Sequence, residues 1–159
     1  EKFKLYHKSY LGLDLSDREI GNLSKEFSKL VLTQVIDSPY VFGALDFFKT
    51  CQTRYDLFIS TGTPIEEIKL ILKAKNTHKY FKEVYGSPAS KISHIREILA
   101  KYQHACDELV FVGDAIVDRD SARKAGIKFI GRITTADEIK EEVLLMDDFT
   151  SLIRIIEKL

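Results

Sequence analysis

A pair of aspartates, Asp114 and Asp118, gives the strongest chemical signal in the sequence, because both follow the apolar run at residues 109–112. Two carboxylates held close together repel each other unless a cation compensates their charge, and hard oxygen donors suit Mg²⁺. A structural explanation also exists, in which a Gly-Asp turn precedes a helix and Asp118 caps that helix. Since an apolar strand pattern comes before the pair and a helical pattern after it, we interpret the pair as a magnesium site.

A second group consists of small polar residues, Ser60, Thr61 and Gly62, which follow the apolar residues 57–59. Hydroxyl groups and an accessible backbone at the start of a helix can donate hydrogen bonds to an anion. A strand-to-helix turn with a capping hydroxyl accounts for the same residues without any ligand. On local sequence alone, they are candidate phosphate-binding residues with this alternative open.

The third signal is Lys91, which stands at the start of a predicted helix within residues 85–99. The amino-terminal end of a helix is already positive, so a cation there is unfavourable unless an anion lies nearby. The alternative is a lysine that simply extends into solvent. Lys91 is therefore a candidate partner for a bound anion.

Alternating strands and helices would position these residues. The apolar runs at residues 55–61 and 108–114 each precede a helical pattern, and residues 128–132 and 143–146 supply two further short strands. This alternation is typical of βαβ units, so we predict an α/β fold with a Rossmann-like parallel sheet and helices on both faces. Ligands of such sheets bind at the carboxyl ends of the strands, where the three signals lie.

The residues before the first strand have a purely helical pattern. Ser16 is predicted to be the N-cap of a long amphipathic helix, with Glu19 completing a capping box. A shorter helical pattern precedes it, and a further helix is expected at residues 43–52. Thr63 is predicted to cap the helix after the first strand. We therefore predict a small helical cap at residues 1–38 and an α/β core at residues 39–159.

The composition limits the classes of function. Lys and Arg number 24, as do Asp and Glu, so no broad cationic surface is expected for nucleic acid or for an anionic membrane. Cys51 and Cys106 lack the spacing of a metal site and are interpreted as reduced, packed thiols of a cytoplasmic protein. No signal-peptide pattern and no membrane-spanning run is present. The sequence does not indicate an oligomeric state.

Taken in order, the three signals resemble the motifs of a known family. The segments "FISTGTP", "GSPASK" and "FVGDAIVDRDSARKAGIKFIGR" are similar to the second, third and fourth motifs of the haloacid dehalogenase superfamily, in particular its phosphoglycolate-phosphatase-like branch. The resemblance covers nearly the whole chain. It implies a magnesium-dependent phosphatase for a small phosphorylated metabolite, in which an aspartate forms an aspartyl-phosphate that water then hydrolyses.

The resemblance also implies a role for each candidate residue. Thr61 would hydrogen-bond the transferring phosphoryl group, with Ser60 as the alternative if the register shifts by one residue. Lys91 would neutralise the charge of the nucleophile and of the phosphoryl group. Asp114 would bind Mg²⁺ directly, and Asp118 would bind it directly or through water. The helical segment at residues 1–38 would be the small cap of this branch.

One motif of the family is missing from the sequence. The first motif is an apolar strand ending in Asp-x-Asp, which supplies the nucleophile and the general acid/base. Asp14 and Asp17 are the nearest match, but no apolar strand precedes them and Ser16 between them is a helix cap. In the family this strand lies in the middle of the sheet, so its loss leaves unpaired backbone groups in both neighbours. We expect a segment upstream of Glu1, or a partner chain, to fill this position, and the 159 residues alone to be inactive.

Two other classes of function remain as alternatives. A non-catalytic member of the same fold could keep the anion pocket for binding or scaffolding, and its gene would then lack the first motif. A receiver-like or nucleotide-binding α/β module could use an acidic pocket for signalling. The second alternative leaves the helical cap and the ordered threonine, lysine and paired aspartates unexplained.

Overall fold

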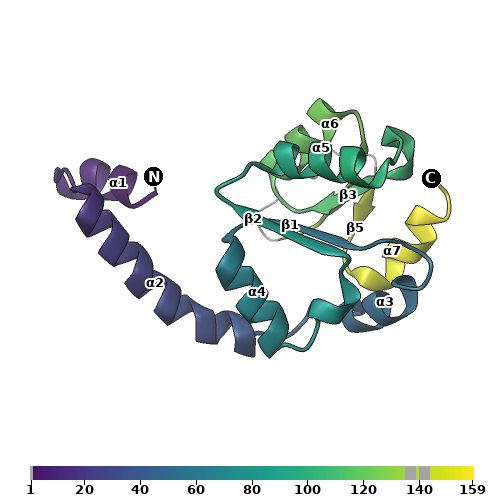
Figure 1. Cartoon of the computed structure of the whole chain (residues 1–159), viewed down its shortest axis with the longest axis horizontal. Coiled ribbons are helices and arrows are strands. Elements are labelled where there is room, and N and C mark those ends of the chain that lie inside the picture. The colour runs from purple at the N-terminus through teal and green to yellow at the C-terminus, as the bar shows by residue number, and fades with distance from the viewer. Residues whose placement is uncertain (1, 135–138, 140–143) are drawn as a thin grey trace. The chain divides into compact units, whose positions relative to one another are not determined.

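The computed structural model of the chain describes residues 2–134, 139 and 144–159 (Figure 1). The chain divides into two compact units, Glu1–Ser38 and Pro39–Leu159. No helix within the described ranges is both long enough and apolar enough to cross a membrane.

The first unit is a helical segment with α1 (Lys2–Tyr6), the π-helix η1 (His7–Leu11) and α2 (Asp17–Asp37). The capping box at the start of α2 is confirmed, because Ser16 Oγ accepts from Glu19 N at 3.3 Å and the Glu19 carboxylate accepts from Ser16 N at 2.8 Å. In this part of the structure α2 has no buried residue, and its apolar Phe27 and Leu30 are exposed. The helix is therefore held by its own backbone and cap rather than by a core.

The second unit alternates strands and helices. Its strands are β1 (Phe58–Pro64), β2 (Glu83–Ser87), β3 (Val110–Gly113), β4 (Lys128–Arg132) and β5 (Leu145–Met146). Its helices are α3 (Ala44–Cys51), α4 (Ile65–Ala74), α5 (Lys91–Tyr102), α6 (Ile116–Ala125) and α7 (Phe149–Ile156), with single 3-10 turns η2 (His78–Tyr80) and η3 (Cys106–Glu108).

All strand pairings in the described residues are parallel, which confirms the predicted α/β fold. β1 pairs with β2, and β3, β4 and β5 form a second sheet in that order. Helices α5 and α6 lie on one side of the strands, and α3 and α7 lie on the other (Figure 1). The described strands therefore form two separate parallel sheets within one layered unit.

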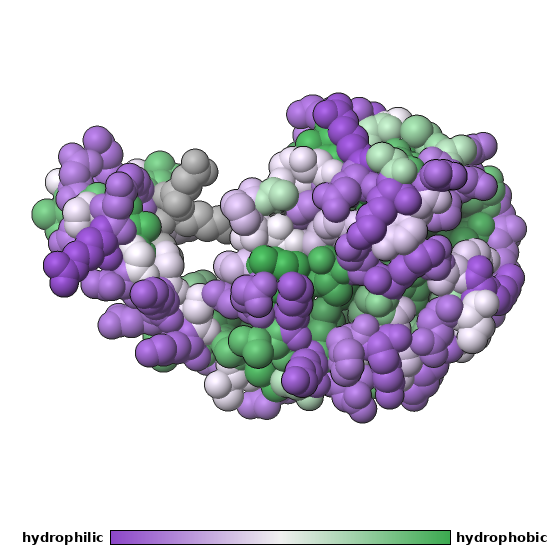
Figure 2. Space-filling model, in the orientation of Figure 1, coloured by the Kyte–Doolittle hydropathy of each residue, from purple (hydrophilic) through white to green (hydrophobic). Residues whose placement is uncertain are grey.

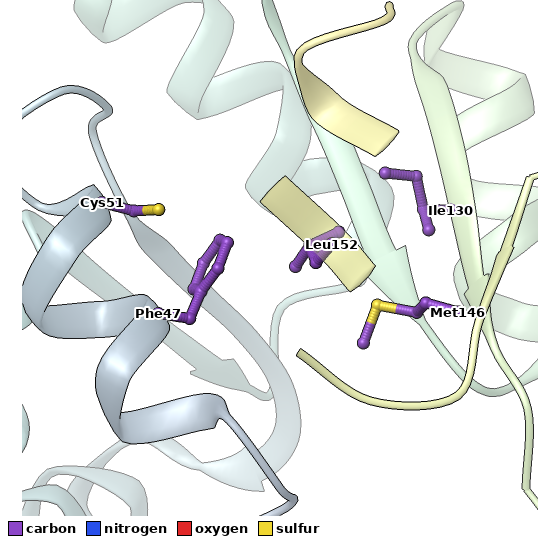
Figure 3. Close-up of a cluster of buried hydrophobic side chains, with 5 residues drawn as sticks. All are labelled: Phe47, Cys51, Ile130, Met146 and Leu152. Carbon is purple, nitrogen blue, oxygen red and sulfur yellow. The ribbon is translucent and has the colours of Figure 1, made fainter. Parts of the chain in front are cut away.

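Two hydrophobic clusters fill the space between strands and helices. On the α3 and α7 side, the phenyl ring of Phe47 points toward Leu152 (Figure 3). This cluster consists of Phe47, Cys51, Ile130, Met146 and Leu152, and the cluster on the α5 and α6 side consists of Ile95, Ala122, Ile127, Phe129 and Ile139. Adjacent residues of β4, Phe129 and Ile130, contribute to different clusters, because successive strand side chains point to opposite faces.

The surface of the second unit is mostly hydrophilic on the face shown in Figure 2, with an apolar patch exposed near α4. Cys51 is buried and Cys106 is exposed, and neither forms a disulfide. The prediction of packed thiols was therefore wrong for Cys106. Its segment is a single 3-10 turn, which is too short to cover a side chain on both sides.

Several predicted element boundaries also differ from the structure. Strand β1 continues through Thr63 to Pro64, so the N-cap of α4 is Pro64, without a side-chain hydrogen bond, and the prediction of Thr63 as N-cap was wrong. Strand β2 was not predicted, because its sequence EVYGS is short and has no alternating apolar pattern. It is a strand because it pairs with β1. Strand β5 covers only the last two residues of the run predicted at 143–146, of which residue 143 lies outside the described residues.

Candidate active site

The acidic part of the site lies directly after β3. Asp118 belongs to the first turn of α6 and is only 3% exposed. Its Oδ2 accepts a hydrogen bond from Ala115 N at 3.2 Å, so the carboxylate closes the turn that connects β3 to α6. Asp118 is thus the third residue of the helix and not its N-cap, which is Ala115.

Gly113 makes this arrangement possible. A Cβ at position 113 would lie 2.5 Å from Asp118 Cβ and 2.6 Å from Asp118 Cγ, which no side chain can tolerate. Only glycine allows the buried carboxylate to pack directly on the end of β3. The Gly-Asp sequence that the motif requires therefore has a steric cause in this chain.

Lys91 supplies the positive charge opposite Asp118. Its Nζ donates to Asp118 Oδ1 from the first residue of α5, and the two side chains are 21% and 4% exposed. The ion pair joins the starts of α5 and α6 and compensates the charge of a carboxylate that would otherwise be buried alone. Lys91 is therefore not a solvated surface lysine.

Asp114 differs from Asp118 in its surroundings. Its side chain is 53% exposed and forms a loose ion pair with Arg132 at the end of β4, with Nη1 at 3.8 Å from Asp114 Oδ2. The Nε atom of Arg132 is buried and has no hydrogen-bond partner in the parts of the chain that the structure describes. The structure therefore adds a guanidinium group to this side of the site.

Ser60 and Thr61, which the structure places inside β1, hydrogen-bond to different partners. Ser60 Oγ lies 2.8 Å from Nδ1 of His94, a residue of α5 that is 1% exposed. Thr61 Oγ1 accepts from Thr63 N and donates to Thr63 Oγ1, both at 3.2 Å, and thereby folds the strand end around Gly62. Burial lowers the pKa of His94, so the ring is neutral at neutral pH.

Gly86 brings the end of β2 against the end of β1. A Cβ at this position would lie 2.6 Å from Thr63 O and 2.8 Å from Ile65 Cα, so only glycine permits this approach. The register places Pro64 opposite Ser87, and Ser90 Oγ then accepts from Ser93 N at 3.2 Å to start α5. The close approach carries Lys91 to the same sheet edge as Thr61.

A deep groove runs between β1 and β3 in the middle of the second unit. Its volume is about 1010 Å³. We call it the central groove. Residues of both strands and of the helices on both sides line it, among them Phe47, Phe48, Phe58, Ile59, Ile95, Ile98, Val110, Phe111, Leu152 and Ile156. Thr61 and Lys91 therefore belong to the side of the groove formed by β1 and β2. Asp114 and Asp118 belong to the side formed by β3.

The donor set fits a hard divalent cation. Asp114 and Asp118 come from one turn, and each faces a positive side chain in this structure, Arg132 or Lys91. In the described residues no group of three or more acidic, histidine or cysteine side chains is gathered for a metal ion. Mg²⁺ commonly takes one or two protein carboxylates and completes its coordination with water and phosphate oxygens, so two aspartates are sufficient as the protein's share.

The structure brings some of the residues predicted for this site together and places two further residues, Arg132 and His94, beside them. Lys91 and Asp118 are in direct contact, whereas the described hydrogen bonds of Thr61 Oγ1 are made with Thr63. Arg132 follows an apolar strand, so the criterion that selected Asp114 could have found it. His94 lies on the apolar face of α5, where a histidine gives no signal of its role until Ser60 is seen beside it.

The sequence of the chain matches a known protein family. Residues 17–132 match the family model described as haloacid dehalogenase-like hydrolase. No curated protein sequence matches the chain at a significant level.

Solved structures resemble the chain in fold at low sequence identity. A predicted phosphatase from Clostridium acetobutylicum has a TM-score of 0.77 and 18% identity, covering 98% of this chain and 77% of that one. A predicted phosphoglycolate phosphatase from Haemophilus somnus has a TM-score of 0.78 and 17% identity, covering 96% and 73%. A hydrolase of this family from Bacillus subtilis, solved with bound magnesium, has a TM-score of 0.75 and 16% identity, covering 98% and 69%.

Proposed function

The chain belongs to the haloacid dehalogenase-like hydrolases, and we propose that it forms most of a magnesium-dependent phosphatase that acts on a small phosphorylated metabolite in the cytoplasm. The observation that carries this proposal is the ion pair between Lys91 and the buried Asp118 at the carboxyl ends of the strands, beside the more exposed Asp114. An isolated anion or cation would be costly there, whereas a paired set can exchange partners with a metal ion and a phosphate.

Three residues, Thr61, Gly62 and Lys91, would bind the phosphoryl group. Thr61 would donate from its hydroxyl group together with the backbone at Gly62, where the structure leaves open space. The contact of Ser60 with His94 supports Thr61 rather than Ser60 in this role, because the Ser60 hydroxyl is already engaged below the strand end. Lys91 would neutralise the phosphoryl oxygens, since its Nζ is held at the same edge by Asp118.

Asp114 and Asp118 would hold the magnesium ion. When bound, Mg²⁺ would offset the negative charge of the phosphoryl group and of the two carboxylates. Asp118 is fixed by Ala115 N and by the contact with Gly113, so it provides a preorganised oxygen. The loose pair between Asp114 and Arg132 leaves the Asp114 carboxylate able to turn toward the ion.

The covalent step needs an aspartate that the described residues do not place at this edge. In the proposed reaction a carboxylate oxygen attacks phosphorus, the bond from phosphorus to the leaving oxygen breaks, and that oxygen takes a proton. Water then attacks the aspartyl-phosphate, which releases phosphate and restores the carboxylate. We propose that a strand from outside the 159 residues carries this aspartate, so that the chain alone is inactive.

One observation favours a second candidate, a non-catalytic binding or scaffold protein with the same pocket. The residues that we propose to bind phosphate and metal include the ion pair of Lys91 and Asp118, although the described part of the chain offers them no nucleophile. This candidate predicts phosphate binding without turnover in every form of the protein, whereas the phosphatase predicts turnover once the missing strand is supplied.

The test is the hydrolysis of an aryl phosphate by a longer polypeptide that includes the reading frame upstream of residue 1, with and without Mg²⁺. We expect magnesium-dependent turnover that Asp114→Asn reduces by several orders of magnitude without unfolding the protein, because the Asp114 side chain is 53% exposed. Asp120→Asn is the matched control, since Asp120 pairs with Arg119 on the surface of the same helix. Turnover unaffected by Asp114→Asn would contradict the proposal.

A further inference from the structure

The candidate site contains two ion pairs, which lie on opposite faces of the strands. Lys91 and Asp118 belong to α5 and α6, on one face (Figure 1). Ile130 of β4 lies in the cluster on the α3 and α7 side, and Arg132 follows it by two residues, so the Arg132 side chain points to that other face. There Arg132 Nη1 approaches Asp114 Oδ2 at 3.8 Å. The two pairs therefore reach the carboxyl ends of β3 and β4 from different sides.

Arg132 is incompletely paired. Its side chain is 30% exposed, and its Nε atom is buried without a hydrogen-bond partner in the described residues. The distance of 3.8 Å to Asp114 is too long for a hydrogen bond. A guanidinium group has several N–H donors in one plane, and burial of such a donor without an acceptor is costly. The group is thus partly removed from water but has no close acceptor within the parts of the chain that the structure describes.

Two other arginines of the chain show closer pairing. Arg54 Nη1 donates to the carboxylate of Glu157 at 3.0 Å. Arg119 Nε donates to the carboxylate of Asp120 at the same distance. The Arg54 side chain is 54% exposed, so it is more accessible to water than Arg132 and still has a hydrogen-bonded carboxylate. The loose pairing is therefore a property of position 132 and not of the arginines in general.

The charge of the site favours an anion beside Arg132 once Asp114 binds a metal ion. The two carboxylates and two cations of the ion pairs cancel each other in formal charge. A divalent cation bound to these carboxylates leaves the site positive, and a phosphate group carries a charge of about −1.5 to −2 near neutral pH. When Asp114 turns toward the cation, Arg132 loses the carboxylate that faces it in this structure. A phosphate oxygen can then take the place of that carboxylate.

From these observations we infer that Arg132 is an anion-binding residue of the candidate site, which pairs with Asp114 in the absence of metal and with a phosphate oxygen when Asp114 binds a divalent cation. The planar guanidinium group can present two N–H donors to two phosphate oxygens, which the single ammonium group of a lysine does not match. The inference deepens the proposed function and rests on its metal site.

The exchange of partners couples the two ligands. In the absence of phosphate, Arg132 competes with the cation for Asp114, so it weakens the binding of the cation. In the presence of the cation, Arg132 is available to the anion, so it strengthens the binding of the anion. Metal and phosphate should therefore each raise the affinity for the other, and by the same factor. A residue that only supports the fold would not act on the two ligands in opposite directions.

The test compares Arg132→Gln with the unaltered 159-residue chain. Calorimetry gives the affinity for Mg²⁺ alone and for inorganic phosphate in saturating Mg²⁺, and broadening of amide signals by Mn²⁺ locates the cation. We expect Arg132→Gln to bind Mg²⁺ about threefold more tightly, because the competitor for Asp114 is removed. The variant should bind phosphate about tenfold more weakly, because a charge-assisted hydrogen bond is lost.

Two further variants sharpen the comparison. Arg132→Lys keeps the charge but not the planar pair of donors, so its affinity for Mg²⁺ should stay near that of the unaltered chain while its affinity for phosphate falls. Arg54→Gln removes an arginine that precedes β1, at the sheet edge away from the site, and should change neither affinity. If Arg132→Gln does not show a cooperative thermal transition, Arg132→Lys and Arg54→Gln decide the matter.

Unchanged phosphate affinity in Arg132→Gln and Arg132→Lys, or weaker Mg²⁺ binding by Arg132→Gln, would overturn the inference and leave the proposed metal site in place. If Mn²⁺ broadens no signals around Asp114 and Asp118, the metal site of the proposed function fails and the inference fails with it. If both affinities change as expected but the longer polypeptide gives no turnover, Arg132 stands as an anion-binding residue and the proposed phosphatase mechanism fails.

Discussion

The strands β4 and β3 are neighbours in one sheet, yet their environments differ. β4 has a paired strand on each edge, and its residues Phe129 and Ile130 are 9% and 0% exposed. β3 carries Gly113 and leads into the two aspartates of the site, but it is half-buried along its whole length and borders the central groove. The strand that contributes most to the site is therefore the less complete part of the fold.

The difference concerns the contacts that hold the ion pair of the candidate site. The buried pair of Lys91 and Asp118 joins α5, which packs on β1 and α6, to α6, which packs on β3 and β4, and Asp118 lies against Gly113. The described polar contacts of this pair are with each other and with Ala115 N, and none of these residues lines the central groove. Asp118, which we propose as a metal ligand, is therefore fixed by contacts that lie outside the groove.

The largest expected effect is on the free energy of unfolding, when the same substitution is made in β4 and in β1. Ile130→Ala removes a fully buried side chain from β4 and should lower the free energy of unfolding by about 2 to 5 kcal/mol. Ile59→Ala removes the same atoms from β1, where the side chain lines the groove and is only half-buried, and should cost about half of this or less.

Urea denaturation of both variants provides the measurement, with the slope of the transition checked for constancy. Equal losses for Ile130→Ala and Ile59→Ala would show that β1 is as well packed as β4. The groove would then be closed in solution, which would remove the contrast between the two regions.

Much of the fold was predictable from local patterns. The apolar runs that became β3 and β4, the capping box of Ser16 and Glu19, and the start of α5 at Lys91 all follow from residue spacing. β2 was not predictable in this way, because Glu83–Ser87 has no alternating pattern and is a strand only through its pairing with β1. The need for glycine at position 86, near the end of β2, becomes clear only from the structure, because a Cβ there would clash with Thr63 and Ile65.

A smaller expected effect concerns pH and the buried His94 on the β1 side of the groove. Because burial lowers its pKa in the folded state, the unfolded chain takes up a proton at a higher pH than the folded chain does. The folded state should therefore lose stability as pH falls below about 6.5, with a slope of up to about 1.4 kcal/mol per pH unit from this group. Above that pH the group should contribute no slope.

The unfolding free energy of the His94→Phe variant, measured between pH 7.5 and 5.5, checks this. The variant should lose part of the pH dependence seen in the unaltered protein, and substitution of the exposed His78 is the control for the loss of a histidine. An identical pH dependence in the unaltered protein and the His94→Phe variant would show that the histidine beside Ser60 is accessible to protons in the folded state.

The residues of the candidate site could be proposed from the sequence, but their contacts could not. Asp114, Asp118, Lys91 and Thr61 could be selected because each follows a predicted strand or begins a predicted helix. The sequence could not show that Asp118 is buried and paired while Asp114 is exposed, because that difference depends on the packing of Asp118 against Gly113. The contact between Ser60 and His94 joins residues 34 positions apart and is likewise invisible in the local pattern.

The most direct test of the central claim is the release of phosphate from an aryl phosphate by the 159-residue chain in Mg²⁺, measured with and without a strand peptide ending in Asp-x-Asp. We predict that the chain alone releases no phosphate. With the peptide, we predict magnesium-dependent release of phosphate, and the Asp114→Asn substitution should abolish this release. Release by the chain alone that Asp114→Asn abolishes would contradict the account, because the nucleophile would then lie within these residues.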